Sequence, residues 1–136
     1  MACHEKQVFK TNKAPAAIGP YSVATGGGPF IFTAGQIGLD PATGEIVSGG
    51  IEAQTRQVLT NIQSILKAAN SCLDNVVKTT VYLIDMNDFA KMNVVYAEFF
   101  TSDFPVRSTV QVAGLPRQAL IEIDAISMVC NDGDCC

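Results

Sequence analysis

Histidine is nearly absent from this sequence of 136 residues, where His4 is the only one. One histidine close to the start of the chain excludes most Ser–His and Cys–His nucleophile systems. It also excludes the histidine-rich catalytic zinc sites. Proton transfer at any site in this chain must therefore fall to carboxylates, tyrosine, lysine or water.

Positive charge and long apolar runs are scarce as well. The chain has nine Lys and Arg and 13 Asp and Glu, which gives a net charge of -4. It also has no run of basic residues, so it is a poor candidate for nucleic-acid binding. No apolar stretch is long enough to span a bilayer, and the N-terminus has the features of neither a signal peptide nor a transit peptide. We therefore expect a cytoplasmic protein without membrane or nucleic-acid partners.

Cysteine is present in odd number. Five cysteines without a signal peptide argue against a disulfide framework and for a reducing compartment. Three of them lie in the tail, at Cys130, Cys135 and Cys136, with no second Cys/His pair at a zinc-like spacing nearby. We expect exposed thiols in this tail, with a metal clip as the alternative, and no metal site elsewhere.

The length fits one domain, which we place at residues 1–129, followed by the Cys-rich tail 130–136. Hydrophobic residues make up 48% of the chain and charged residues 16%. Either the core is large for a chain of this size, or a partner covers part of the apolar surface.

The first third of the sequence predicts three strands, at about 7–10, 22–25 and 30–33. Gly26-Gly27-Gly28-Pro29 separates the last two and indicates a hairpin turn. A phosphate-binding loop is the alternative for these glycines, but no Gly-Lys-Ser/Thr follows them and the next segment has a strand pattern.

Two amphipathic helices follow, at about 51–69 and 88–101, with a strand at 75–84 between them. The first has an apolar face at helical spacing, formed by Ile51, Val58, Leu59, Ile62, Ile65, Leu66 and Ala69. Its polar residues are expected to face outward: Gln54, Arg56, Gln57, Asn61, Gln63 and Lys67. The second begins after a cap at Asp85 or Asn87 and has a stripe of core residues: Phe89, Met92, Tyr96, Phe99 and Phe100.

Two more strands, at 107–112 and 120–129, complete the order β-β-β-α-β-α-β-β. This order predicts an α+β fold in which two helices cover one face of a mixed sheet. The other face carries apolar residues such as Leu120, Ile126 and Met128. We therefore expect oligomerisation through this bare face.

Each of the last two strands carries a charge in an apolar setting, Arg107 in one and Glu122 in the other. A buried charge costs several kcal/mol unless it is paired or used. The pair could form a structural salt bridge, or a site that holds an anion and moves a proton. A simple hairpin of these strands would place Arg107 opposite Asp124 with Glu122 diagonal to it, but the pair could equally close across a subunit boundary.

The motifs Pro105-Val-Arg-Ser and Leu120-Ile-Glu-Ile-Asp-Ala resemble the RidA/YjgF family of reactive-intermediate deaminases. The likeness continues in Ala17-Ile-Gly-Pro-Tyr-Ser, Phe32-Thr-Ala-Gly-Gln-Ile, Asp85-Met-Asn-Asp-Phe and Asn93-Val-Val-Tyr-Ala-Glu-Phe-Phe. It covers nearly the whole chain except the Cys-rich tail.

This resemblance implies a chorismate mutase-like fold, assembled as a homotrimer with ligand clefts between subunits. It also implies hydrolysis of 2-imino acids, such as those from 2-aminoacrylate and 2-aminocrotonate, to 2-oxo acids and ammonia without a cofactor. Arg107 would clamp the substrate carboxylate, and Glu122 would activate water and pass a proton to the departing nitrogen.

By the same resemblance, Tyr21, Gly35 and Asn93 would line the cleft. Thr109 stands where many members carry Cys, which puts thiol-based contacts at that position in doubt. The rival functions are a non-catalytic carboxylate-binding regulator, a ribonuclease and a holdase-like chaperone.

Overall fold

The computed structural model describes residues 5–131 of the chain. It contains two α-helices and seven strands, joined by short 3₁₀ turns at Leu73–Asn75, Met86–Asp88 and Pro116–Gln118. In chain order the elements are β1 (Gln7–Phe9), β2 (Ala24–Gly27), β3 (Phe30–Thr33), β4 (Gln36–Ile37), α1 (Gly50–Ala68), β5 (Val76–Leu83), α2 (Phe89–Phe99), β6 (Val106–Gln111) and β7 (Ile121–Met128). The two-residue strand β4 was not predicted.

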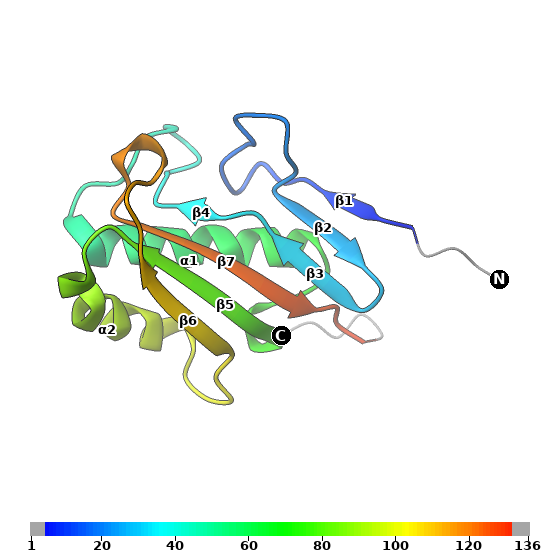
Figure 1. Ribbon diagram of the computed structural model, residues 1–136. Coiled ribbons are helices and arrows are strands. Elements are labelled where there is room, and N and C mark those ends of the chain that lie inside the picture. The colour runs from blue at the N-terminus through cyan, green and yellow to red at the C-terminus, as the bar shows by residue number, and fades with distance from the viewer. Residues whose placement is uncertain (1–4, 132–136) are drawn as a thin grey trace.

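The strands form one mixed sheet in the order β1-β2-β3-β7-β5-β6, with β4 also paired to β7 (Figure 1). Of the two arrangements considered for the last two strands, the simple hairpin does not form, because β5 lies between β6 and β7. The cause is the helical connection through α2, which returns the chain parallel to β5 and makes β6 an edge strand. The other edge of β5 is then free to pair antiparallel with β7.

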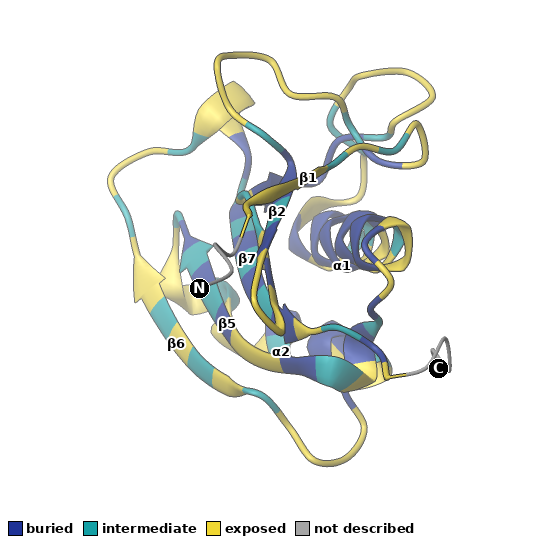
Figure 2. Ribbon diagram, turned by 90° about the vertical axis from the view of Figure 1, so that its right-hand side faces the viewer, coloured by how far each residue is buried: buried dark blue, intermediate teal, exposed yellow. Residues whose placement is uncertain are grey.

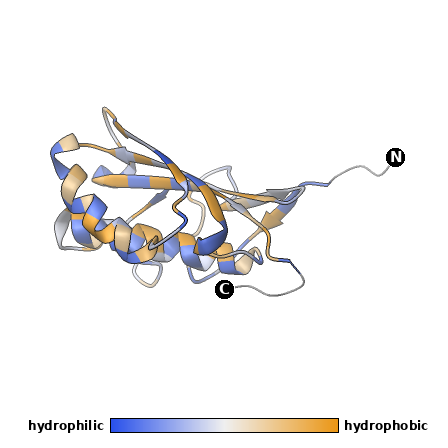
Figure 3. Cartoon of the chain, turned by 90° about the horizontal axis from the view of Figure 1, so that it is seen from below, coloured by the Kyte–Doolittle hydropathy of each residue, from blue (hydrophilic) through white to orange (hydrophobic). Residues whose placement is uncertain are grey.

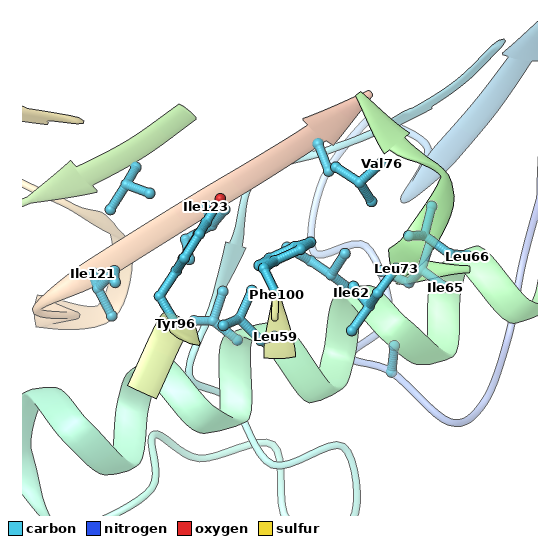
Figure 4. Packing of buried hydrophobic residues seen from close by; sticks show 14 of the residues in the cluster. Leu59, Ile62, Ile65, Leu66, Leu73, Val76, Tyr96, Phe100, Ile121 and Ile123 are labelled. Carbon is cyan, nitrogen blue, oxygen red and sulfur yellow. The ribbon is translucent and has the colours of Figure 1, made fainter. Parts of the chain in front are cut away.

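Both helices pack on one face of the sheet, as predicted (Figure 3). The seven residues of the predicted apolar face of α1 are all buried. They form the core with Tyr96 from α2, with Phe100 directly after that helix, and with Ile121 and Ile123 from β7 (Figure 4). The periodicity of the sequence therefore identified the helix–sheet interface correctly.

Two polar residues of α1 do not face outward as predicted. Gln54 and Asn61 are both buried. The Gln54 side-chain oxygen accepts a hydrogen bond from the Leu120 N–H at 2.9 Å, and the Asn61 amide donates to the Leu39 carbonyl at 2.9 Å. These side chains satisfy backbone groups at the ends of β4 and β7, where no ladder partner is available.

The other face of the sheet lacks any cover within residues 5–131. Figure 2 shows buried and intermediate residues along most of β7, whereas β6 alternates between exposed and intermediate residues. Five large apolar side chains lie exposed on this open face: Phe30, Phe32, Val106, Val110 and Met128. Part of the apolar excess seen in the composition thus lies on this surface.

The cysteine predictions are wrong where the structure describes them. Cys130 is buried, with 7% of its surface exposed, and both Cys72 and Cys130 are disulfide-bonded. Cys130 also donates its backbone N–H to the Asn70 carbonyl at 2.8 Å, so the chain just after β7 is part of the packed fold. Cys135 and Cys136 lie outside the described residues. The odd number of cysteines could not reveal this disulfide bonding, because only the folded structure brings cysteines that are distant in the sequence close together.

No helix in residues 5–131 is both long and apolar enough to cross a membrane.

The turn before β7 holds two consecutive non-glycine residues in the left-handed region. Arg117 and Gln118 have φ of 58° and 56°, and the Arg117 side chain donates to the Gly44 carbonyl at 3.0 Å. The left-handed conformation costs about 1–2 kcal/mol for a residue with a Cβ. This turn is therefore strained, and it leads directly into β7.

We expect Gln118→Gly to stabilise the fold by roughly 0.5–1 kcal/mol, because glycine adopts this φ without strain although it costs more chain entropy. The midpoint of urea unfolding at fixed protein concentration measures the change. Gln63→Gly, on the exposed face of α1, is the matched control and should destabilise by about 1 kcal/mol. A loss of stability in Gln118→Gly would show that the turn is not strained.

Candidate functional site

Arg107 lies on β6 and faces the helix layer. Its register partner on β5 is Thr79, which is buried and bonds α2 through the Tyr96 hydroxyl at 2.8 Å. Neighbouring residues in register share a face of the sheet, so Arg107 points the same way. Its guanidinium carbon lies 4.7 Å from the Tyr96 ring centroid and 5.6 Å from that of Phe89.

This partly buried cation has no acidic partner within the described chain. The one ion pair of residues 5–131 joins Arg56 to Glu98 at 2.8 Å, on the exposed surface of the helices. A structural salt bridge between Arg107 and Glu122 is therefore wrong for a single chain. A guanidinium without a carboxylate at the edge of a hollow is a natural place for an anionic ligand.

The hollow beside Arg107 measures about 440 Å³ and is lined by Asn93, Tyr96, Ala97, Phe104, Pro105 and Arg107. The Asn93 side-chain oxygen is buried and has no hydrogen-bond partner. An unpaired buried acceptor costs about 1–3 kcal/mol, so a donor from a ligand or another chain would be favourable here. Thr109 follows Arg107 by two residues on the same face but does not line this hollow.

Glu122 lies on β7 and faces away from the helices. Its neighbours Ile121 and Ile123 are buried in the core, so strand alternation directs Glu122 to the open face. It lines a second hollow of about 360 Å³ together with Tyr21 and Gly35. Burial raises the pKa of the Glu122 carboxyl, and the negative charge of Asp124 raises it further.

Gly35 makes room for the Glu122 carboxyl. A Cβ added at Gly35 would lie 2.6 Å from Cδ of Glu122 and closer still to Oε2. Any side chain at position 35 would therefore displace the carboxyl. Tyr21 closes the other side of the hollow, where its hydroxyl oxygen accepts a hydrogen bond from the Ile18 N–H at 3.2 Å.

Three residues close to Arg107 or Glu122 were not identified as site residues from the sequence. Tyr82 pairs with Glu122 in register, and its hydroxyl donates to Asp124 Oδ2 at 3.0 Å. Burial, followed by the contact with Asp124, raises the pKa of Tyr82, so this hydroxyl remains a donor. Phe89 and Tyr96 were assigned to the core stripe, and only the place of β6 beside α2 shows that they meet Arg107.

The six residues singled out from the sequence thus form two groups. Arg107, Asn93 and Thr109 lie on the helix side near the β6 edge, whereas Glu122, Gly35 and Tyr21 lie around the open-face hollow. Neither of these two hollows contains both Arg107 and Glu122. Within the described chain, Arg107 and Glu122 thus lie on opposite faces of the sheet and do not share a site.

Within residues 5–131, no three His, Cys, Asp or Glu side chains are grouped so that they could hold a metal ion. The chemistry that these two groups can offer is anion binding by Arg107 and proton transfer by Glu122.

Known proteins match this sequence over most of its length. The family model described as Endoribonuclease L-PSP matches residues 11–129. A RutC family protein of Pyrococcus horikoshii is 59% identical over 90% of this chain and 97% of its own length. The 2-iminobutanoate/2-iminopropanoate deaminase of Homo sapiens is 49% identical over 90% of this chain and 90% of that protein.

Solved structures share the fold at similar coverage. A protein of the conserved Rid family from Yersinia pestis has a TM-score of 0.90 at 44% identity, covering 92% of this chain and all of that one. The E. coli protein TdcF, solved with bound serine, has a TM-score of 0.87 at 41% identity, covering 91% of this chain and 99% of that one. The chain therefore belongs to the RidA/YjgF family, which the description Endoribonuclease L-PSP also denotes.

Proposed function

We propose that this protein hydrolyses reactive 2-imino acids, and their enamine forms such as 2-aminoacrylate and 2-aminocrotonate, to 2-oxo acids and ammonia. The observation that carries the proposal is the partly buried Arg107 without an acidic partner in the described chain, in a family whose human member is named for this reaction. Serine in TdcF supports it, because serine presents a carboxylate beside an α-nitrogen, as an imino acid does.

In this mechanism Arg107 binds the substrate carboxylate and so fixes the position of the adjacent C=N bond. Glu122, whose carboxyl has a raised pKa, takes a proton from water as the oxygen attacks the imine carbon. The same carboxyl then gives that proton to the nitrogen, which yields a carbinolamine. It next takes the proton of the carbinolamine hydroxyl and passes it to the nitrogen as the C–N bond breaks, so that ammonia leaves and the C=O bond forms. An imine is already electrophilic, so orientation and one general base, worth about 10²–10⁴ in rate, are a sufficient addition.

The proposed site is completed by a homotrimer. The five exposed apolar side chains of the open face would be covered by neighbouring copies, and the same contact would bring Glu122 of one chain toward Arg107 of the next. We propose that the ligand cleft lies at this boundary, with Tyr21, Gly35, Asn93 and Thr109 around it.

Two rival functions make different predictions. A carboxylate-binding regulator would keep the role of Arg107 but would bind 2-oxobutanoate without turnover of imino acids. Ribonuclease activity, which the family description mentions, is poorly served by a net charge of -4 and a single histidine.

We expect Arg107→Ala and Glu122→Ala each to abolish imine hydrolysis. Trimers reassembled at random from equal amounts of the two variant chains should recover about a quarter of wild-type activity. One boundary in four would then join an intact Arg107 to an intact Glu122. The assay generates 2-iminobutanoate with an L-amino acid oxidase and traps the remaining imine with semicarbazide.

Native mass spectrometry is the measurement that establishes how many of the trimers contain both kinds of chain. Mixed trimers without recovered activity would contradict a shared cleft. A wild type that leaves trapping unchanged for several imino acids would contradict the deaminase proposal itself, and binding of 2-oxobutanoate would then favour the regulator.

Gly35→Ala should lower kcat/KM by about 100-fold without unfolding the protein. The new methyl group displaces the Glu122 carboxyl, which is the flexible end of its side chain, so the backbone need not move. Gly114→Ala is the matched control, because a Cβ there meets nothing within 4 Å. Equal activity of the two variants would show that the position of the Glu122 carboxyl is not important for the reaction.

Asp124→Asn should extend activity to lower pH. Asp124 raises the pKa of Glu122, so removing its charge lowers that pKa and keeps Glu122 ionised at a lower pH. The measurement is kcat/KM against pH, expressed relative to uncatalysed hydrolysis at each pH. The exposed Asp74→Asn variant should follow the wild type. If kcat/KM of Asp124→Asn falls at the same acidic pH as that of the wild type, the group whose protonation causes this fall is not Glu122.

A further inference from the structure

The guanidinium of Arg107 is met by two aromatic rings of one helix. Phe89 and Tyr96 are seven residues apart on α2, which places them two turns apart on the same face. Their ring centroids lie 5.6 Å and 4.7 Å from the guanidinium carbon, within the range of a cation–π contact. The cation therefore rests against both rings.

The two rings differ in how firmly they are held. Tyr96 is 6% exposed, its hydroxyl bonds the buried Thr79 at 2.8 Å, and its ring lies 4.7 Å from that of Phe100. Phe89 is the first residue of α2 and is 38% exposed. Tyr96 is thus a fixed support built into the core, whereas Phe89 is a surface ring that can be changed without opening the core.

This support matters because arginine is long and flexible. In the absence of an acidic partner, Arg107 would otherwise sample many rotamers, and a ligand would have to select the productive one. A planar guanidinium that rests against rings keeps its N–H groups along its edge, where a carboxylate can accept two hydrogen bonds.

We propose that Phe89 and Tyr96 are positioning residues that hold Arg107 ready for a ligand carboxylate. The proposal rests on the proposed role of Arg107 as the carboxylate clamp. The carboxylate itself does not change during imine hydrolysis, so its contact with Arg107 is the same in the ground state and in the transition state. Loss of this support should therefore weaken binding and leave the chemical step intact.

We expect Phe89→Ala to raise the Kd for 2-oxobutanoate and the KM for 2-iminobutanoate by about three- to tenfold, with kcat within about twofold of wild type. Phe89→Leu, which keeps apolar bulk but not the ring, should show the same loss, whereas Phe89→Tyr should restore binding. Val94→Ala, on the same helix and 69% exposed, is the matched control and should bind like the wild type.

An NMR measurement tests the geometry without any ligand. Ring currents from Phe89 and Tyr96 should shift the Arg107 Nε–H resonance, identified by its loss in Arg107→Lys, away from those of Arg56 and Arg117. Phe89→Ala should reduce this shift, and Val94→Ala should not.

Unchanged binding in Phe89→Ala, or a fall in kcat at constant KM, would overturn the proposal. If the wild type binds 2-oxobutanoate but turns over no imino acid, the deaminase proposal fails and the Kd series still decides the role of Phe89. If the wild type does not bind 2-oxobutanoate, Arg107 is not a carboxylate clamp and the proposed positioning role falls with it.

Discussion

The alternation of side chains along β-strands is the constraint on which the rest of this structure depends. Arg107 pairs with Thr79 of β5 and Glu122 pairs with Tyr82, three positions further along the same strand. An odd separation places the two side chains on opposite faces of the sheet. A shift of either register by one residue would bring both charges to the same face of the sheet.

The two faces have different roles because only one of them is packed within the chain. On the helix side, buried polar side chains of the core are paired: Gln54 and Asn61 bond backbone groups, and Thr79 bonds Tyr96. The Asn93 side-chain oxygen is the exception among the described residues, and it lies beside Arg107. In a fold whose other buried polar groups are satisfied, an unsatisfied polar atom tends to occur where a ligand or partner is expected to bind.

The open face combines apolar side chains with carboxylates. Phe30 and Phe32 lie exposed on β3 beside β7, and β7 itself carries the exposed Met128 together with Glu122 and Asp124. Contact with another copy would bury both kinds of group at once and would remove water from the Glu122 carboxyl. In the proposed assembly, subunit contact and proton chemistry would therefore share one surface. The partly buried Glu122 carboxyl lies on the face that no helix of residues 5–131 covers.

The sequence by itself determined the elements and the residues. Apolar periodicity located both helices and six of the seven strands, and charge in an apolar strand singled out Arg107 and Glu122, because these signals depend only on neighbours along the chain. Strand order, the disulfide bonding of Cys72 and Cys130, and the contacts of Arg107 with Phe89 and Tyr96 came only with the tertiary structure. Residues far apart in the chain make these contacts. A local pattern does not specify which strand lies between two others, or whether two charged residues lie on the same face of the sheet.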